Sequence, residues 1–305
     1  MVVIEIAGVS WMKKLEKMSD SLITTLIAGG TGLISSLITI YWLKPKIDRK
    51  FHIFQLEENY KHEQAKKIKE IIGQYKSQLL NSAEHLHSRL KNYSKNCSEN
   101  WLEVNGDYHT NHYYIDTMVY RFLNFFAYIK LVEDNLEYLD TTNSENDDME
   151  MIRYFRIFAD VISDVDLFKG SDYDANNQSD HIFRNRFEQY YECLIQEKKI
   201  ISFNLFEDRK DELIEYIQPI YMFFDGMNKT EPRYRLERLK CFHCILISFL
   251  NHFGYDFQET KLTKVQKLKK LLGPLKFESG LKIIIKKYKL KGSKQLTELV
   301  IDNYK

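Results

Sequence analysis

The pattern of apolar and polar residues is most distinctive near the start of the chain. Residues 21–43, SLITTLIAGGTGLISSLITIYWL, carry no charged side chain over 23 positions. As an α-helix this segment spans about 34 Å, against a hydrocarbon layer of roughly 30 Å in a bilayer. The pattern predicts a single transmembrane helix over 21–43, preceded by a short interfacial segment over 1–20.

The residues of this helix separate into two faces. At 3.6 residues per turn, small and hydroxyl-bearing residues share one arc and branched aliphatic residues share the other, with only Gly30 on the wrong side. The small face contains Ser21, Thr24, Thr25, Ala28, Gly29, Thr31, Gly32, Ser35, Ser36 and Thr39. A simple lipid anchor has no need of such sorting, so one face is suited to lipid and the other to a neighbouring helix or to water.

Part of the small face forms a heptad-like line with steps of 4, 3, 4 and 3. This line is formed by Thr25, Gly29, Gly32, Ser36 and Thr39, and it is continued by Met18 on one side and Leu43 on the other. Small residues allow two helices to pack closely, which gives a dimeric or packing-only oligomer. The small face covers close to half of the helix, however, and a wide polar face suits a ring of three or more helices around water.

The ring arrangement predicts a pore in the membrane. The five residues of the line are then pore-lining, and Met18 and Leu43 are candidate hydrophobic constrictions that close the pore by excluding water. A packing-only oligomer and a monomeric anchor are the two alternatives. Cations follow the span more densely than they precede it, so the positive-inside bias places the large C-terminal part in the cytosol.

The rest of the chain has helical periodicity throughout. Apolar residues recur at steps of three and four from about 47 to 95, and Pro45 predicts a break or kink just before that helix. Further helices are expected at about 110–139, 148–168, 180–197, 207–225, 231–253 and 261–272. Segment 282–290, KIIIKKYKL, fits either a helix or a short hairpin. The fold class is therefore all-α: after the transmembrane helix, a long connecting helix over 44–95, an irregular cytosolic helical domain over 96–260, and a lysine-rich segment over 261–305.

Composition supports this fold class and adds an asymmetry of charge. Four prolines and twelve glycines in 305 residues are too few for a turn-rich β-sandwich or barrel. The net charge is only +1, yet residues 133–174 are rich in Asp and Glu while residues 261–294 are rich in Lys. Four scattered cysteines form no disulfide framework, which fits a reducing compartment.

The lysines near the C-terminus are candidate ligand-binding residues. Those closest together are Lys282, Lys286, Lys287 and Lys289. They suit the phosphates of a nucleotide or oligonucleotide, the headgroups of membrane lipid, or the acidic surface of a neighbouring subunit. The sequence does not choose among these three partners.

No motif predicts catalysis, a metal or a cofactor. The chain has no nucleophile elbow, P-loop, dinucleotide fingerprint or H-E-x-x-H. Cys241 and Cys244, on either side of His243, are expected to be buried core residues, because no second ligand pair lies at zinc-site spacing. His109 and His112 are expected to be ordinary residues at the start of a helix. We therefore expect a protein that is not an enzyme.

The organisation resembles that of single-pass membrane effectors of bacterial abortive-infection (anti-phage) defence. Residues 75–92, YKSQLLNSAEHLHSRLKN, and 119–128, VYRFLNFFAY, are similar to segments of a membrane-associated helical family of bacteria and plants. Within defence systems, the architecture resembles the channel effector of Hailong-type systems. The resemblance implies a channel in the bacterial inner membrane, gated by a nucleotide or oligonucleotide signal on the cytosolic domain, with a nucleotidyltransferase as partner. It carries no site residues with it.

Overall fold

The computed structural model describes residues 3–140, 146–173, 176, 180–273 and 275–290, and it confirms the all-α class. The chain divides into two compact units, residues 1–63 and 64–305. Within the described residues, the extended structure is one small hairpin, in which strand β1 (Ile195–Gln196) pairs antiparallel with β2 (Lys199–Ile200). We refer to residues 64–305 as the helical unit.

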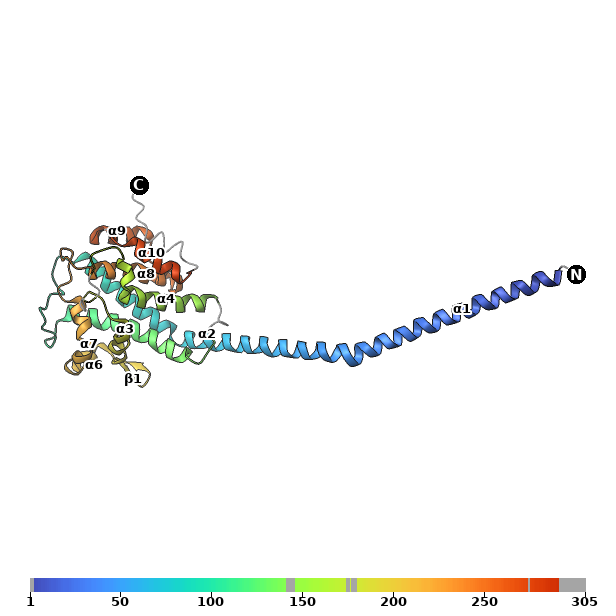
Figure 1. Ribbon diagram of the computed structural model, residues 1–305. Helices are drawn as coiled ribbons and strands as arrows, with labels where there is room; N and C mark the ends of the chain where they lie inside the picture. Colours follow the sequence, from blue (N-terminus) through green and yellow to red (C-terminus); the bar gives the residue numbers. More distant parts are fainter. Residues whose placement is uncertain (1–2, 141–145, 174–175, 177–179, 274, 291–305) are drawn as a thin grey trace. The chain divides into compact units, whose positions relative to one another are not determined.

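The first unit is one long helix with a single irregular turn. Helix α1 (Val3–Ile38) is followed by a π turn, η1 (Thr39–Leu43), and then by α2 (Lys44–Lys95), which continues into the helical unit (Figure 1). Pro45 lies at the second position of α2, where its ring would collide with the carbonyl of Tyr41 in a regular helix. The backbone N–H of Lys44 instead donates to the carbonyl of Thr39, five residues back. Of the expected break or kink, the break is absent, and a widened turn accommodates the proline without ending the helix.

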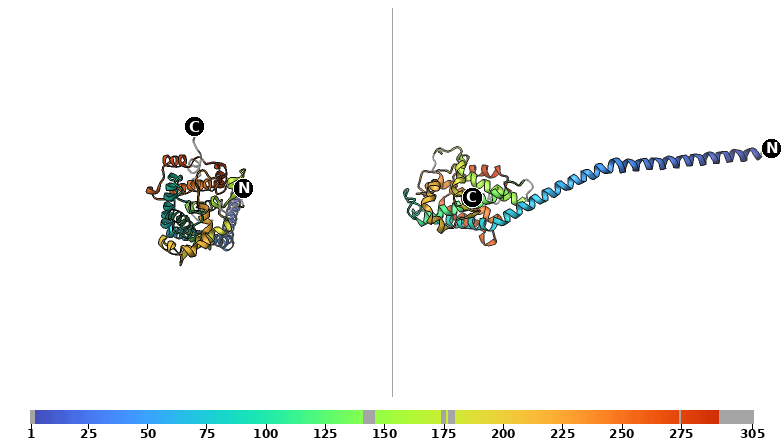
Figure 2. Two further views of the ribbon diagram at one scale, coloured as in Figure 1. Left: turned by 90° about the vertical axis from the view of Figure 1, so that its left-hand side faces the viewer. Right: turned by 90° about the horizontal axis from the view of Figure 1, so that it is seen from below.

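The second part of α2 is buried at helical spacing. Ile68, Ile72, Leu79, Leu86 and Leu90 are all covered by the rest of the helical unit. This periodicity is the one that predicts the connecting helix from sequence. Two views of the ribbon show the helices of residues 64–305 gathered around a common interior (Figure 2).

An aromatic core joins the central helices of the helical unit. These are α3 (Tyr113–Leu136), α4 (Asn146–Ser163) and α8 (Arg235–Phe253), and α4 packs directly on α8. Phe125 of α3 meets Phe158 of α4 edge to face at 4.9 Å, and Phe242 of α8 lies 5.3 Å from Phe158. Such arrangements add to the stability that burial alone provides. These contacts bring several of the chain's 19 phenylalanines together in one core.

A buried arginine fixes α8 against the end of α4. Arg238 is fully buried and donates to the carbonyl oxygens of Val161 and Asp164, at 2.7 and 3.0 Å. Its guanidinium also lies 4.7 Å from the ring of Phe168. Burial lowers the pKa of Arg238. The cation satisfies carbonyls that the end of a helix leaves without partners.

The remaining elements surround this core. In chain order they are η3 (Val165–Phe168), α5 (Arg184–Glu192), α6 (Phe203–Asp208), α7 (Lys210–Phe224), η4 (Asp256–Gln258), α9 (Leu262–Leu272) and α10 (Glu278–Lys287). Most predicted helices are found with shifted ends, but the helix expected over 180–197 ends at Glu192, and Ile195 and Gln196 belong to strand β1. The single helix expected over 207–225 is wrong in its start, because α6 ends at Asp208 and Arg209 leaves the helical conformation before α7. The ambiguous segment 282–290 is helical up to Lys287, since Leu281, Ile284 and Ile285 all face the core.

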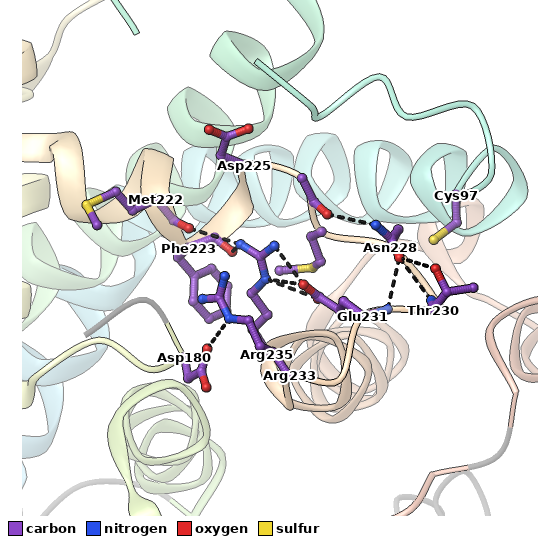
Figure 3. A network of polar contacts seen from close by, with 12 residues as sticks. Cys97, Asp180, Met222, Phe223, Asp225, Asn228, Thr230, Glu231, Arg233 and Arg235 are labelled. Carbon is purple, nitrogen blue, oxygen red and sulfur yellow. Dashed lines mark hydrogen bonds and ion pairs between the residues drawn. The ribbon is translucent and has the colours of Figure 1, made fainter. Parts of the chain in front are cut away.

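A polar network fixes the turn between α7 and α8 (Figure 3). Arg235 donates to the carbonyl oxygens of Met222 and Phe223, each at 3.0 Å, and pairs with Glu231 at 2.7 Å. Asn228 accepts the backbone N–H of Glu231 at 3.0 Å. The network satisfies the last carbonyls of α7, which have no partner inside that helix.

Candidate functional site

The apolar helix has the length and composition of a membrane span. Residues 17–95 are helical, and within them a window of 18 residues is apolar, nearly free of charge and not buried by the chain. Among the residues that the structure describes, one helix is long and apolar enough to cross a bilayer. The kind of membrane that this helix would cross and its orientation in that membrane remain predictions.

The threonines of the small face use their hydroxyl protons within the helix. The Oγ1 atoms of Thr25 and Thr39 donate to the carbonyls of Ser21 and Ser35, each at 2.8 Å. Thr31 does the same with Ala28 at 3.0 Å. Because these donors are satisfied, the hydroxyl oxygens remain available as acceptors, for water or for a neighbouring helix. The arrangement also reduces the free-energy cost of placing a threonine against lipid.

The glycines of the span have no close neighbours among the described residues outside their own helix. A Cβ atom added at Gly29, Gly30 or Gly32 would meet no atom within 4 Å. Among the described residues, therefore, no internal packing requires a small residue at these positions. Close approach of another helix or access of water would give their size a role.

The two predicted constrictions are both exposed on the helix. Met18 is 57% exposed and Leu43 is 49% exposed. Leu43 lies at the end of the π turn, which takes up more residues per turn than an α turn. It is therefore rotated by tens of degrees from the line of Thr25 to Thr39 on which an uninterrupted α-helix would place it. The role of Leu43 as a gate stays a prediction.

Large apolar side chains also remain exposed beyond the span. Ile47, Phe51 and Phe54 of α2 are 61%, 58% and 57% exposed, although basic residues separate them from the apolar run. Their steps of four and three place them on one face of α2. An apolar face of this kind is unfavourable in water, and contact with a second copy of the helix or with the membrane interface would cover it.

The predicted lysine site is divided by contacts within the chain. Lys287 donates to the buried Asp160 at 2.8 Å, and the hydroxyl of Tyr288 donates to the same carboxylate at 2.6 Å. Arg184 pairs with its other oxygen at 2.5 Å. Burial of Asp160 opposes its ionisation, but the hydrogen bonds from Lys287 and Tyr288 outweigh it and lower the pKa. The acidic and basic stretches of this chain thus meet within one molecule at Asp160 and Lys287. A neighbouring subunit was one of the three partners that the sequence left open for these lysines.

The other three lysines differ in their surroundings. Lys282 pairs with Glu278 on the same helix, while Lys286 and Lys289 are exposed. Residues 291–305 of the lysine-rich segment lie outside the described residues. Ligand binding by Lys282, Lys286, Lys287 and Lys289 stays a prediction, and for Lys287 it competes with Asp160.

The cysteine–histidine motif belongs to the core, as expected, but its histidine has a partner that the sequence does not reveal. Cys241 and Cys244 are buried thiols, and burial raises the pKa of Cys241. The Nε2 atom of His243 lies 3.0 Å from the Nδ1 atom of His87 on α2. Burial lowers the pKa of His87 to about 4, and that of His243 well below its usual value. No local spacing signals a pair that is 156 residues apart.

His109 and His112 lie at the entry to α3, as the sequence predicts. His112 is the N-cap residue of α3, and its Nε2 atom lies 3.3 Å from a carboxylate oxygen of Asp107. The buried Asp116 accepts from Lys210 and from Tyr221, both at 2.7 Å. Within the described part of the chain, no three His, Cys, Asp or Glu side chains are placed to hold a metal ion together.

Comparison with known proteins adds no relative. No family model matches the chain, and neither a curated protein nor a solved structure matches it.

Proposed function

We propose that this chain is an oligomeric membrane protein whose apolar helix, together with at least two further copies, surrounds a water-filled pore. The observation that carries the proposal is the small face of α1, which is wide and rich in hydroxyls, and whose glycines have no packing partner among the described residues outside their own helix. Its threonine hydroxyls already donate within the helix and can accept hydrogen bonds from water. A pore gives this face a solvent, and lipid does not.

The proposal places the helical unit on the cytosolic side of a bacterial inner membrane. A nucleotide or oligonucleotide made by a nucleotidyltransferase partner would act on this unit, as the resemblance to anti-phage effectors implies. Helix α2 belongs to both units, so movement of its buried part is the available route from the ligand to the span. Opening of the pore would then dissipate ion gradients in an infected cell.

The experiment is the conductance of the purified full chain in planar bilayers, without ligand and with added nucleotide. A variant with Gly29→Leu, Gly32→Leu and Ser36→Leu fills the small face, and we expect it to lose the current. The matched control changes Ile23, Ile27 and Ile38 to Leu on the aliphatic face, and it should conduct like the wild type. Equal currents from the filled variant and the wild type, or no current from the wild type under either condition, would contradict the pore.

A membrane-tethered scaffold is the second candidate. The observation that favours it is the set of hydroxyl bonds within α1, because satisfied donors make contact with lipid or with a packed helix less costly. Exposed Phe51 and Phe54 would then serve oligomerisation alone. A scaffold predicts the same oligomers in detergent as a pore, but no ion flux in liposomes.

A further inference from the structure

A cavity of about 440 Å³ lies in the helical unit between α2, α3 and the start of α6. Aromatic rings and hydrogen-bonding side chains form its walls, and among the described residues that line it there is no carboxylate. Its volume falls within the range of small-molecule sites. None of the residues that line the cavity belongs to the apolar helix or to the C-terminal lysines, so neither predicted site includes it.

Two arginines give the cavity a positive charge without a counter-ion. Arg121 lines the cavity and donates to the carbonyl of His85 at 3.0 Å. Arg89 is buried behind the wall and donates to the hydroxyl of Thr117, which also lines the cavity. Neither arginine forms an ion pair with a carboxylate of the described residues. Burial and the nearby charge of Arg89 both lower the pKa of Arg121.

This pair of cations favours an anion in the cavity. Two like charges held in partly buried positions raise the free energy of the empty site, and a bound anion would lower it. A guanidinium presents parallel N–H donors that match the oxygens of phosphate. The Nε atom of Arg89 is buried and has no hydrogen-bond partner in the described structure, so part of its donor capacity is unused.

Aromatic rings lie on the wall beside the arginines. Tyr113, Tyr120 and Phe203 form a group in which Phe203 lies 6.4 Å from Tyr113 and 5.3 Å from Tyr120, between ring centroids. Tyr128 lines the same cavity. Tyr113 is 65% exposed, so a large aromatic surface faces solvent here instead of the core. Rings at the mouth of a charged cavity offer stacking surfaces to a planar group.

The side-chain oxygen of Asn124 on α3 accepts no hydrogen bond within the described structure. This Oδ1 atom is buried, and Asn124 lines the cavity. A buried acceptor without a donor costs free energy, and a ligand N–H would recover it if the amide turned its oxygen toward the cavity. The amino group on the edge of a nucleobase is a donor of this kind.

We propose that this cavity binds a nucleotide, with its phosphates at Arg121 and its base against Tyr113 and Phe203. The arginines favour an anion, the aromatic rings favour a planar group, and the oxygen of Asn124 favours a hydrogen-bond donor. A nucleotide provides all three. The claim that this site senses the gating signal rests on the proposed function. The claim that the site binds a nucleotide depends only on the cavity.

The test is calorimetric titration of the purified full chain in detergent with ADP, pyrophosphate and adenosine. ADP carries the anion and the purine ring together, so we expect saturable binding that is tighter than for either fragment. Arg121→Gln should weaken ADP binding by roughly 10- to 100-fold, the loss of hydrogen bonds to a charged group. Tyr113→Ala should weaken ADP and adenosine but leave pyrophosphate unchanged.

Matched controls are Arg186→Gln and Tyr216→Ala, which change exposed residues of the same types outside the cavity. Both should bind ADP like the wild type, and thermal melting confirms that all variants fold. Absence of ADP binding at millimolar concentration, or equal binding by Arg121→Gln, would overturn the proposal. Binding of pyrophosphate as tight as that of ADP would overturn the role of the rings. ADP binding without conductance in any bilayer would leave this site standing and remove the pore.

Discussion

At the scale of single residues, the buried histidine pair is the feature with the clearest energetic consequence. Only one of the two facing nitrogens of His87 and His243 can carry the proton of their hydrogen bond, so at least one ring is neutral in the folded pair. Burial favours the neutral form of both rings. Burial is the main cause of the lowered pKa at both residues, and the charge of Lys91 adds to it. The pair connects α2 to α8, and Thr260 lies 3.4 Å from His87 at its edge.

The pair predicts a loss of stability in mild acid. Unfolded histidines take up protons near pH 6.5, whereas folded His87 does so only at about pH 4. The stability is therefore complete above pH 6.5 and falls as the pH is lowered toward 4. At pH 5 we expect a loss of about 2 kcal/mol from His87 alone.

Thermal melting of the full chain in detergent at pH 7 and pH 5 measures this loss. The comparison is with a variant that combines His87→Leu and His243→Leu, which removes both titrating groups without leaving one imidazole unpaired. The wild type should lose more of its melting temperature between the two pH values than the variant does. The same loss in both proteins would show that the histidines remain protonated alike in the folded and unfolded states.

At the scale of elements, a buried carboxylate holds the C-terminal end of α10, in addition to the apolar face of that helix. Asp160 of α4 is fully buried and receives Lys287, Tyr288 and Arg184 together. The backbone of Gly280 provides a second fixed point, because a Cβ atom there would lie 2.0 Å from the carbonyl oxygen of Leu167. The helix is thus attached near both ends.

Replacing the carboxylate should loosen the C-terminal end of α10. In Asp160→Asn three donors lose a charged acceptor, and since Lys287 and Arg184 are half exposed we expect a cost of about 1–3 kcal/mol. Hydrogen–deuterium exchange of residues 278–290 should become faster. Asp166→Asn removes the same charge from an exposed position nearby and should leave the exchange unchanged. Unchanged exchange in Asp160→Asn would mean that apolar packing alone holds α10.

The elements that the sequence predicts well are those whose packing depends on residues close together in the chain. Steps of three and four define the buried part of α2, because that pattern depends on one face of one helix. Segment 282–290 stayed ambiguous because its apolar residues are buried only against elements distant in the sequence, α4 and η3, which local spacing does not reveal. The π turn at Thr39–Leu43 also escaped prediction, since proline signals a disturbed helix but not whether the chain breaks or widens there.

At the scale of the whole molecule, the candidate sites also differ in how far they can be predicted from the sequence. The small face of the span is readable because it is periodic within 23 residues. The cavity is not, since it combines α2, α3 and the start of α6, and its cations become significant only when their counter-ions prove to be missing among the described residues. The opposite charges of residues 133–174 and 261–294 suggested an intermolecular contact, yet Asp160 and Lys287 meet within one chain.

The central claim is that water reaches the small face of α1 when the chain is in a membrane. Single cysteines at Thr25 and Ser36 on this face, and at Leu26 and Leu37 on the aliphatic face, would test it directly. The measurement is the change in bilayer current on adding a charged, water-soluble thiosulfonate reagent, with the unsubstituted chain as the control for its four native cysteines. The account predicts modification and a changed current at Thr25→Cys and Ser36→Cys only. Equal protection of both faces would contradict it and leave a packed, dry oligomer.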